Sequence, residues 1–216
     1  MSAQAQPTTT SLERDWWLRL GMVFTAPRTV FAWLRDDSDE AAGARQEPVL
    51  LVGFLAGAAG VLTSNGIAHA LDDFGLDGVD LAVVVLLAAL IYGLVGFFAF
   101  GALVYIGEQV ADGLGSYRRA RHILAFACAP LALSLVLWPL RLALYGVDNF
   151  RSGGSDTGTG GSVFEGIETA VVVWCFALLV LGIRTANGWS WRRTALAAAV
   201  PAIVPVLALA RAYGAL

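Results

Sequence analysis

The stretch LAVVVLLAALIYGLVGFFAFGALVYI, residues 81–106, decides the fold because it carries no charged side chain. As an α-helix rising about 1.5 Å per residue, it is long enough to cross a hydrocarbon core of roughly 30 Å. Apolar runs of similar length occupy 48–71 and 122–145, and shorter ones occupy 163–183 and 194–210. The sequence therefore predicts an all-α fold, a polytopic membrane helical bundle of about five transmembrane helices.

The composition agrees with a membrane protein. Of the 216 residues, 57% are hydrophobic and 14% are charged, whereas a soluble domain has about 25% charged residues. The net charge of −3 argues against a protein that binds nucleic acid. Outside the apolar runs little chain remains for a soluble core, so we expect one membrane domain, 48–216, with a short cytoplasmic front.

The front divides into two parts. Residues 1–10 are polar, and we expect them to be disordered. Residues 11–47 are interpreted as a cytoplasmic amphipathic region, in which Pro27 breaks one helix and begins another, followed by a solvated acidic linker. Neither helix can span a bilayer. Aromatic residues edged by Arg are typical of a helix lying among lipid headgroups, which predicts interfacial anchors at Trp16, Trp17, Phe24, Phe31 and Trp33.

The distribution of Arg predicts the orientation, because cations that flank a span are poorly translocated. Five Arg precede the first span, and the connections 107–121 and 184–193 carry three each. The connection 72–80 carries none, and 147–162 carries one. We therefore expect a cytoplasmic N-terminus and a C-terminus outside. Basic residues that are all Arg, with abundant Ala and Gly, are typical of a GC-rich bacterial gene, which predicts the plasma membrane of a bacterium.

Three groups of motifs carry a family resemblance. They are Ala-Pro-Arg-Thr-Val-Phe at 26–31, Gly-Ser-Tyr-Arg-Arg-Ala-Arg at 115–121 before Ile-Leu-Ala-Phe-Ala-Cys-Ala-Pro at 123–130, and Leu-Gly-Ile-Arg at 181–184 before Asn-Gly-Trp-Ser-Trp-Arg-Arg at 187–193. In this order and spacing, over roughly 17–206, the chain resembles the YIP-domain family of five-span membrane proteins, bacterial type. The resemblance implies a cytoplasmic N-terminal region and no established chemistry.

Eukaryotic members of that family interact with Rab-type GTPases. This chain lacks the Asp-Leu-Tyr-Gly-Pro type of motif found in the eukaryotic trafficking members. The resemblance therefore implies no Rab-type partner, and the expected partners are the lipid bilayer and either another membrane protein or further copies of this chain.

Arg118, Arg119 and Arg121 are candidate contacts for lipid phosphates beside the cytoplasmic leaflet. The rule that cations flank the cytoplasmic ends of spans also explains these three Arg without lipid binding. Gly53, Gly57 and Gly60 lie in the first apolar run at a spacing that allows close helix approach. They predict either a self-association or partner face, or packing inside the bundle.

Three other groups of residues suggest polar sites. His69 could begin a proton or metal path, or it could be an interfacial histidine. Glu108 and Asp112, four apart, suggest either a cation site or a solvated helix end. Arg141, inside the outer part of the third run, is predicted to pair with Glu168 or the shallower Glu165.

The sequence predicts no catalytic, cofactor or metal residues. It has no HExxH, P-loop or Gly-x-Ser-x-Gly motif, and Cys128 and Cys175 show no metal or disulfide pattern. The leading hypothesis is a noncatalytic membrane scaffold or adaptor that organises membranes or binds a partner. The alternative is a small transporter or channel whose third and fifth spans are broken by Pro. A third hypothesis, an enzyme whose chemistry takes place within the membrane, has the least support.

Overall fold

The computed structural model describes residues 9–63, 78–146 and 158–212, and within them every regular element is a helix. Of residues 1–10, predicted to be disordered, 1–8 lie outside the described residues, as does the candidate His69. The prediction is wrong for Thr9 and Thr10, which begin the first helix. The helices are α1 (Thr9–Met22), α2 (Pro27–Trp33), α3 (Asp39–Ala44), α4 (Gln46–Leu62), α6 (Gly78–Val110), α7 (Tyr117–Ala127), α8 (Ala129–Ser134), α9 (Leu137–Tyr145), α10 (Thr159–Asn187) and α11 (Trp191–Ala212).

Three helical segments are long and apolar enough to cross a membrane, by length and composition. They are Leu86–Val110 within α6, Tyr117–Tyr145 through α7, α8 and α9, and Thr159–Asn187. The predicted first and fifth spans correspond to α4 and α11, which do not meet those limits over their described residues. The all-α membrane fold is thus confirmed, and five spans are not.

The three long segments also extend past their predicted ends. The second run was expected at 81–106 and the fourth at 163–183, but the helices continue to Val110 and from Thr159 to Asn187. Their polar ends remain helical because side chains there find partners in the bundle, such as Glu108 with Asn187. The third segment is interrupted at Cys128, where Pro130 in the first turn of α8 has no N–H to donate.

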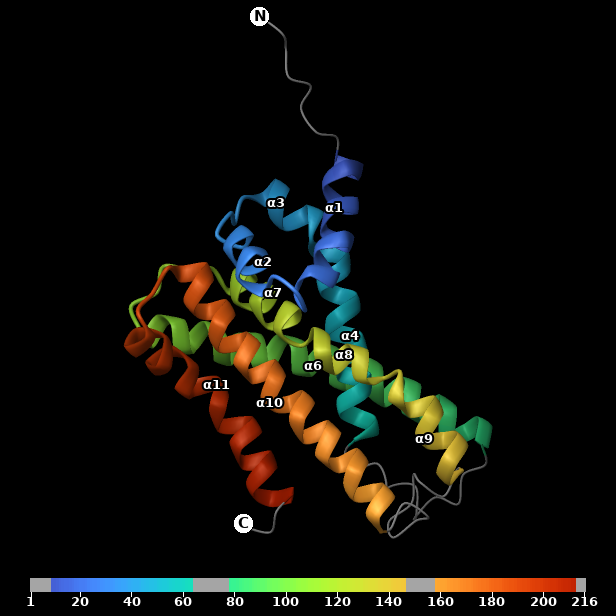
Figure 1. Cartoon of the computed structure of the whole chain (residues 1–216). Coiled ribbons are helices and arrows are strands. Elements are labelled where there is room, and N and C mark those ends of the chain that lie inside the picture. The colour runs from blue at the N-terminus through green and yellow to red at the C-terminus, as the bar shows by residue number, and fades with distance from the viewer. Residues whose placement is uncertain (1–8, 64–77, 147–157, 213–216) are drawn as a thin grey trace, which may run out of the picture.

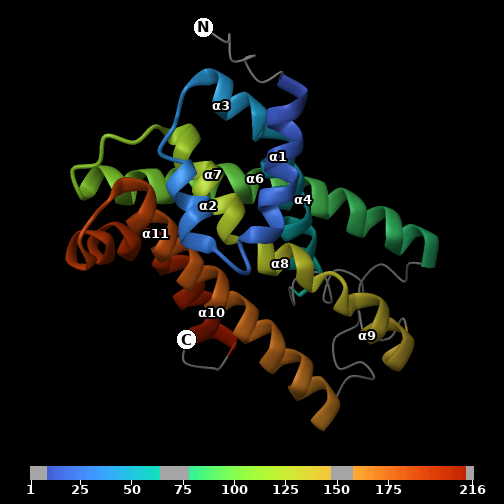
Figure 2. The ribbon, with the colours of Figure 1, turned by 45° about the horizontal axis from the view of Figure 1, so that its top comes forward.

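The residues before α4 form a separate group of helices, which we call the head: α1, α2 and α3, residues 9–45. Figure 1 shows the head gathered over one end of the bundle beside α4 and α7, with α9 and the start of α10 at the opposite end. The view in Figure 2 agrees. Pro27 begins α2 as predicted, and its fixed φ suits the first turn of a helix.

The best-buried core lies where the head meets the bundle. Val30, Phe31 and Leu34 of the head, Ile123 of α7 and Ile183 of α10 are all fully buried. α6, in contrast, exposes a long apolar surface that includes Val83, Leu86, Leu87, Leu90, Ile91 and Val95. A surface so apolar suits lipid rather than water.

Small residues allow the closest helix contacts. Gly57 of α4 lies so near Gly93 of α6 that a Cβ atom on it would overlap the Gly93 backbone, and Gly182 of α10 lies against Ile123 and Phe31. Gly188 ends α10 in the left-handed conformation, with φ of 67°, which glycine adopts without steric cost.

Candidate functional site

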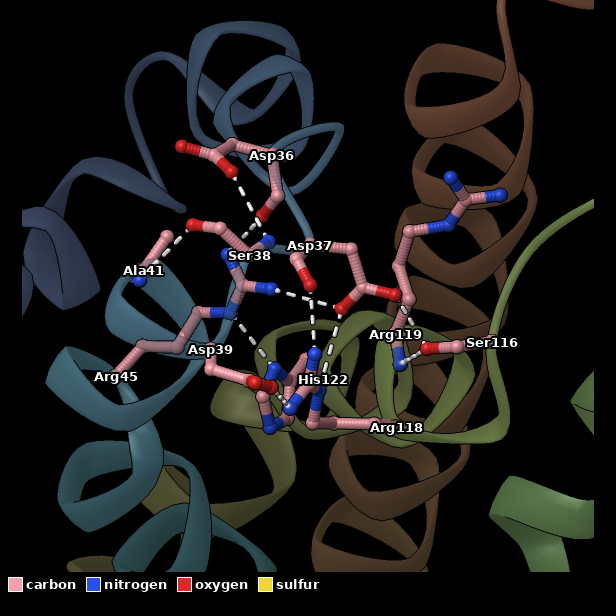
Figure 3. Close-up of polar contacts among 10 residues, drawn as sticks. All are labelled: Asp36, Asp37, Ser38, Asp39, Ala41, Arg45, Ser116, Arg118, Arg119 and His122. Carbon is pink, nitrogen blue, oxygen red and sulfur yellow. Dashed lines mark hydrogen bonds and ion pairs between the residues drawn. The ribbon is translucent and has the colours of Figure 1, made fainter.

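Polar side chains from four segments meet at the head end of the bundle. We call this cluster the joint. Its members come from the segment between α2 and α4, from α6, from the start of α7 and from the end of α10: Asp36, Asp37, Asp39, Arg45, Glu108, Ser116, Arg118, Arg119, His122 and Asn187. Figure 3 shows the part of the joint around Asp37.

Asp37 is the centre of the joint. Its carboxylate accepts a hydrogen bond from the Ser116 hydroxyl and lies 3.4 Å from both the Arg45 and the Arg118 guanidinium nitrogens. The Asp37 carbonyl accepts from Arg118 Nη2 at 2.6 Å, and Arg118 Nη1 lies 2.6 Å from Asp39. Ser116 also caps α7 by accepting from the Arg119 amide. One loop of the head is thereby tied to the first turn of α7.

Arg45 lies deepest in the joint, with its side chain fully buried. It donates to His122 Nδ1 at 2.7 Å and to the Asp36 carbonyl at 2.7 Å. A ring nitrogen that accepts a hydrogen bond carries no proton, so His122 is neutral here. Burial lowers the pKa of Arg45 to about 10, opposed by the charges of Asp37 and Asp36. Arg45 therefore remains a cation at neutral pH.

A second chain of hydrogen bonds joins the bundle helices beneath the head. Arg119 of α7 donates to Asn187 Oδ1 at 2.6 Å, and Asn187 Nδ2 donates to Glu108 Oε1 of α6 at 2.7 Å. Glu108 is fully buried. The amide of Asn187 bridges the Arg119 guanidinium and the Glu108 carboxyl on two other helices, which fixes the relative positions of α6, α7 and α10.

Two further Arg side chains donate hydrogen bonds to backbone carbonyls at the C-terminal ends of helices. Arg35 of the head donates to Thr185 O at 2.7 and 2.9 Å, near the end of α10. Arg193 of α11 donates to Ala111 O at 2.6 Å and Asp112 O at 2.5 Å, just after α6. Cations stabilise the negative end of a helix dipole. These contacts place the ends of α6 and α10 and the start of α11 at the same end of the bundle as the head.

Of the three Arg predicted to contact lipid phosphates, Arg118 and Arg119 are instead engaged by protein oxygens of the joint. Arg121 lies against aromatic rings. The acidic segment that was interpreted as a solvated linker supplies Asp37 and Asp39 to these contacts. That interpretation is wrong for Asp37, because its charge is neutralised by residues distant in sequence.

The predicted interfacial anchors fall into two groups. Trp16 and Phe31 are buried inside the protein, where Trp16 contacts Phe126 at a ring distance of 5.6 Å. The prediction of headgroup contact is wrong for these two residues, because the head packs its apolar face on α7 and α10. Trp17 is exposed, and Phe24 and Trp33 are half-buried; headgroup contact by these three stays a prediction.

The glycines of the first run lie mostly inside the bundle. Gly53 faces the Phe97 ring of α6, and Gly57 faces Gly93. Gly60 is exposed and meets no described atom that a Cβ would contact. For Gly53 and Gly57 the contacts favour internal packing over a partner face.

Near the other end, Arg141 Nη1 of α9 lies 2.6 Å from Glu168 Oε1 of α10. This is the pair expected from their similar depth, whereas Glu165 is exposed. The guanidinium also lies over the Trp138 and Phe164 rings, at 5.0 and 5.6 Å.

Glu108 and Asp112 do not share a helix face. Glu108 is buried, while Asp112 is exposed and has a positive φ of 54°. Neither a shared cation site nor a solvated helix end describes Glu108, because α6 brings it against Asn187. Within the described residues, no three His, Cys, Asp or Glu side chains gather as a metal site, and Cys128 and Cys175 are free thiols.

Sequence reasoning missed Arg45, Asn187 and His122 as members of one cluster. Each stands at the edge of an apolar run, where a polar residue is commonly explained by the membrane boundary alone. The one available signal was that the second and third resemblance motifs supply Ser116, Arg118, Arg119 and Asn187 to the joint and Arg193 to the end of α6.

Comparison with known proteins adds one finding. The family model described as the Yip1 domain matches residues 21–212, which is most of the chain and includes every residue of the joint. No curated protein and no solved structure matches the chain.

Proposed function

The chain belongs to the Yip1 domain family, and we propose that it acts as a noncatalytic, multi-pass membrane scaffold that presents its head to a cytoplasmic partner. The observation that carries the proposal is the joint. The charges around Asp37 are directed at one another, so they hold the head in one position rather than face a substrate. A fixed head suits a binding platform.

The head offers a surface that such a partner would use. An open groove of about 520 Å³ lies on it, and its lining includes Trp16, Arg19, Trp33 and Glu40. The Arg19 guanidinium lies 4.2 Å from the Trp33 ring centroid. Trp and Arg are the residue types that most often dominate protein interfaces, and Glu40 adds a carboxylate that would select a basic group on the partner.

We further propose that the head faces the cytoplasm of a bacterial cell. The contacts of Arg35, Arg45, Arg119 and Arg193 gather the Arg-rich ends of the helices at the head end. A single basic end supports the orientation expected from flanking cations. In a C128A/C175A background, we expect S190C to resist labelling from outside intact cells and S155C to be labelled; the reverse pattern would overturn the orientation.

Proximity labelling from an enzyme fused to the N-terminus tests the scaffold. We expect a reproducible set of labelled proteins that is lost with Glu40→Arg, which reverses one charge in the groove. Glu47→Arg is the matched control, because Glu47 is exposed on α4 and does not line the groove. A labelled set that is equally insensitive to both substitutions would contradict the proposal.

A small transporter or channel remains the second candidate. The observation that favours it is the interruption of the third span at Cys128 and Pro130, since broken helices build substrate sites in many transporters. Uptake of ions or small solutes into proteoliposomes that is abolished by Pro130→Ala would favour this candidate over the scaffold.

A further inference from the structure

Arg121 is held differently from its neighbours Arg118 and Arg119. Its guanidinium carbon lies 4.8 Å from the Phe98 ring centroid, 4.9 Å from Tyr117 and 5.6 Å from Phe97. Within the described parts of the chain, no hydrogen bond or ion pair joins Arg121 to a protein oxygen, and its buried Nε has no acceptor. The side chain is therefore a cation held on three aromatic faces with its donors unused.

The aromatic site around Arg121 is built rather than incidental. The Tyr117 hydroxyl donates to the Phe98 carbonyl at 2.8 Å and so links the first turn of α7 to α6. Gly101 leaves room for the Arg121 stem, because a Cβ there would overlap Arg121 Cγ. Tyr117 also contacts Tyr105, with 6.0 Å between ring centroids. These contacts fix where the guanidinium lies.

The surroundings point to a phosphate group as the missing partner. Arg121 lies one turn beyond Arg118 on α7, where the polar joint gives way to exposed apolar surface: Phe98 is 42% and Val95 61% exposed. Cation–π contact compensates only part of the lost hydration of a guanidinium, and its remaining donors need oxygen acceptors. At the boundary between water and hydrocarbon, the anion that offers them is phosphate.

We propose that Arg121, on its platform of Phe97, Phe98 and Tyr117, binds the phosphate group of an anionic lipid. The apolar surface beside the platform would accept the acyl chains while the guanidinium binds the headgroup. This inference depends on the protein lying in a membrane and not on its role as a scaffold.

Native mass spectrometry of the full chain in detergent tests the site, with phosphatidylglycerol, phosphatidylcholine and inorganic phosphate as three separate probes. Wild-type protein should prefer phosphatidylglycerol to phosphatidylcholine, and Arg121→Gln should lower that preference about fivefold, the effect of one basic residue at an anionic surface. Arg192→Gln, at an exposed Arg of α11, should leave it within about twofold.

The variants separate binding from folding. Arg121→Lys keeps the charge but loses the planar fork, so its preference should lie between those of wild type and Arg121→Gln. If Arg121→Gln lowers binding of inorganic phosphate but not of phosphatidylglycerol, the site takes free phosphate rather than lipid. If Arg121→Gln elutes as a monodisperse species, melts like the wild type and binds all three probes like the wild type, the proposal is overturned.

Discussion

The joint at the head end and the Arg141–Glu168 pair near the other end are both polar contacts in an apolar bundle, but they are built differently. The pair includes one carboxylate and one guanidinium on neighbouring helices. The joint combines charged side chains, an amide group and backbone carbonyls from the head and from α6, α7 and α10. Loss of one member of the pair should therefore act locally, whereas loss of a central joint residue should loosen several elements.

The largest effect is expected at Arg45. Arg45→Ala leaves His122 Nδ1 and the Asp36 carbonyl without their donor and should reduce the free energy of unfolding by about 3 kcal/mol, as for other broken buried ion pairs. Unfolding titrations in bicelles would measure it. Arg28→Ala, at an exposed Arg of α2, should change it by less than about 0.5 kcal/mol. Equal effects would show that the joint does not stabilise the fold.

Asp37 should have the next largest effect. Asp37→Ala removes the acceptor shared by Ser116, Arg45 and Arg118, at a cost of about 2 kcal/mol. Hydrogen exchange should become faster in α2 and α3, because the head loses the carboxylate that links it to Ser116 and Arg118 of α7. Asp39→Asn is the control: the Asp39 side chain is 97% exposed, and exposed pairs contribute little. Unchanged exchange in Asp37→Ala would mean that apolar packing alone holds the head.

The pair should show a smaller, purely local coupling. A double-mutant cycle of Arg141→Ala and Glu168→Ala should give a coupling of about 0.5 to 1 kcal/mol, because the Arg141 side chain is 10% and the Glu168 side chain 26% exposed. Unfolding titrations in bicelles give the four free energies. The same cycle with Glu165→Ala should be additive, and hydrogen exchange in the head should not change. A coupling confined to Glu165 would refute the geometry.

The two regions also differ in how far the sequence predicts them. Apolar run length predicted the membrane fold, Pro27 marked the start of α2, and matched depth at two span ends suggested Arg141 with Glu168. The joint depends on residues up to 81 positions apart, such as Asp37 with Arg118. No local sequence pattern indicates that residues so far apart in the chain are in contact. A charged residue at the edge of an apolar run is consistent with the topology rule in either of two positions. It can face water, as was expected of the acidic linker, or it can be buried, as Arg45 is.

The aromatic front shows the same limit. Trp16 and Trp17 are adjacent in an amphipathic pattern, and the pattern cannot tell whether its apolar face meets lipid or protein. The structure turns Trp16 toward Phe126 and leaves Trp17 exposed. Packing of the head on α7 and α10 decides the outcome, and that packing depends on Gly182, which admits Phe31.

The smallest expected effect is on the stability of the protein at low pH. Hydrogen bonds from the Ser38 backbone and side chain hold the pKa of Asp36 below its ordinary value of 3.8, with a minor contribution from Arg45. A carboxyl whose pKa is lowered by folding stabilises the folded state above its unfolded pKa, and this contribution is lost as pH falls through the folded pKa. The effect should be slight because Asp36 is exposed to solvent.

We therefore expect wild type to lose slightly more stability than Asp36→Asn when the pH falls from about 5 to below about 3.8, measured as the shift of the unfolding midpoint. The side-chain amide oxygen of the Asp36→Asn variant would still accept from the Ser38 backbone N–H, so the difference isolates the charge. If the unfolding midpoints of the two proteins shifted equally with pH, the charge of Asp36 would not contribute to the pH dependence of stability.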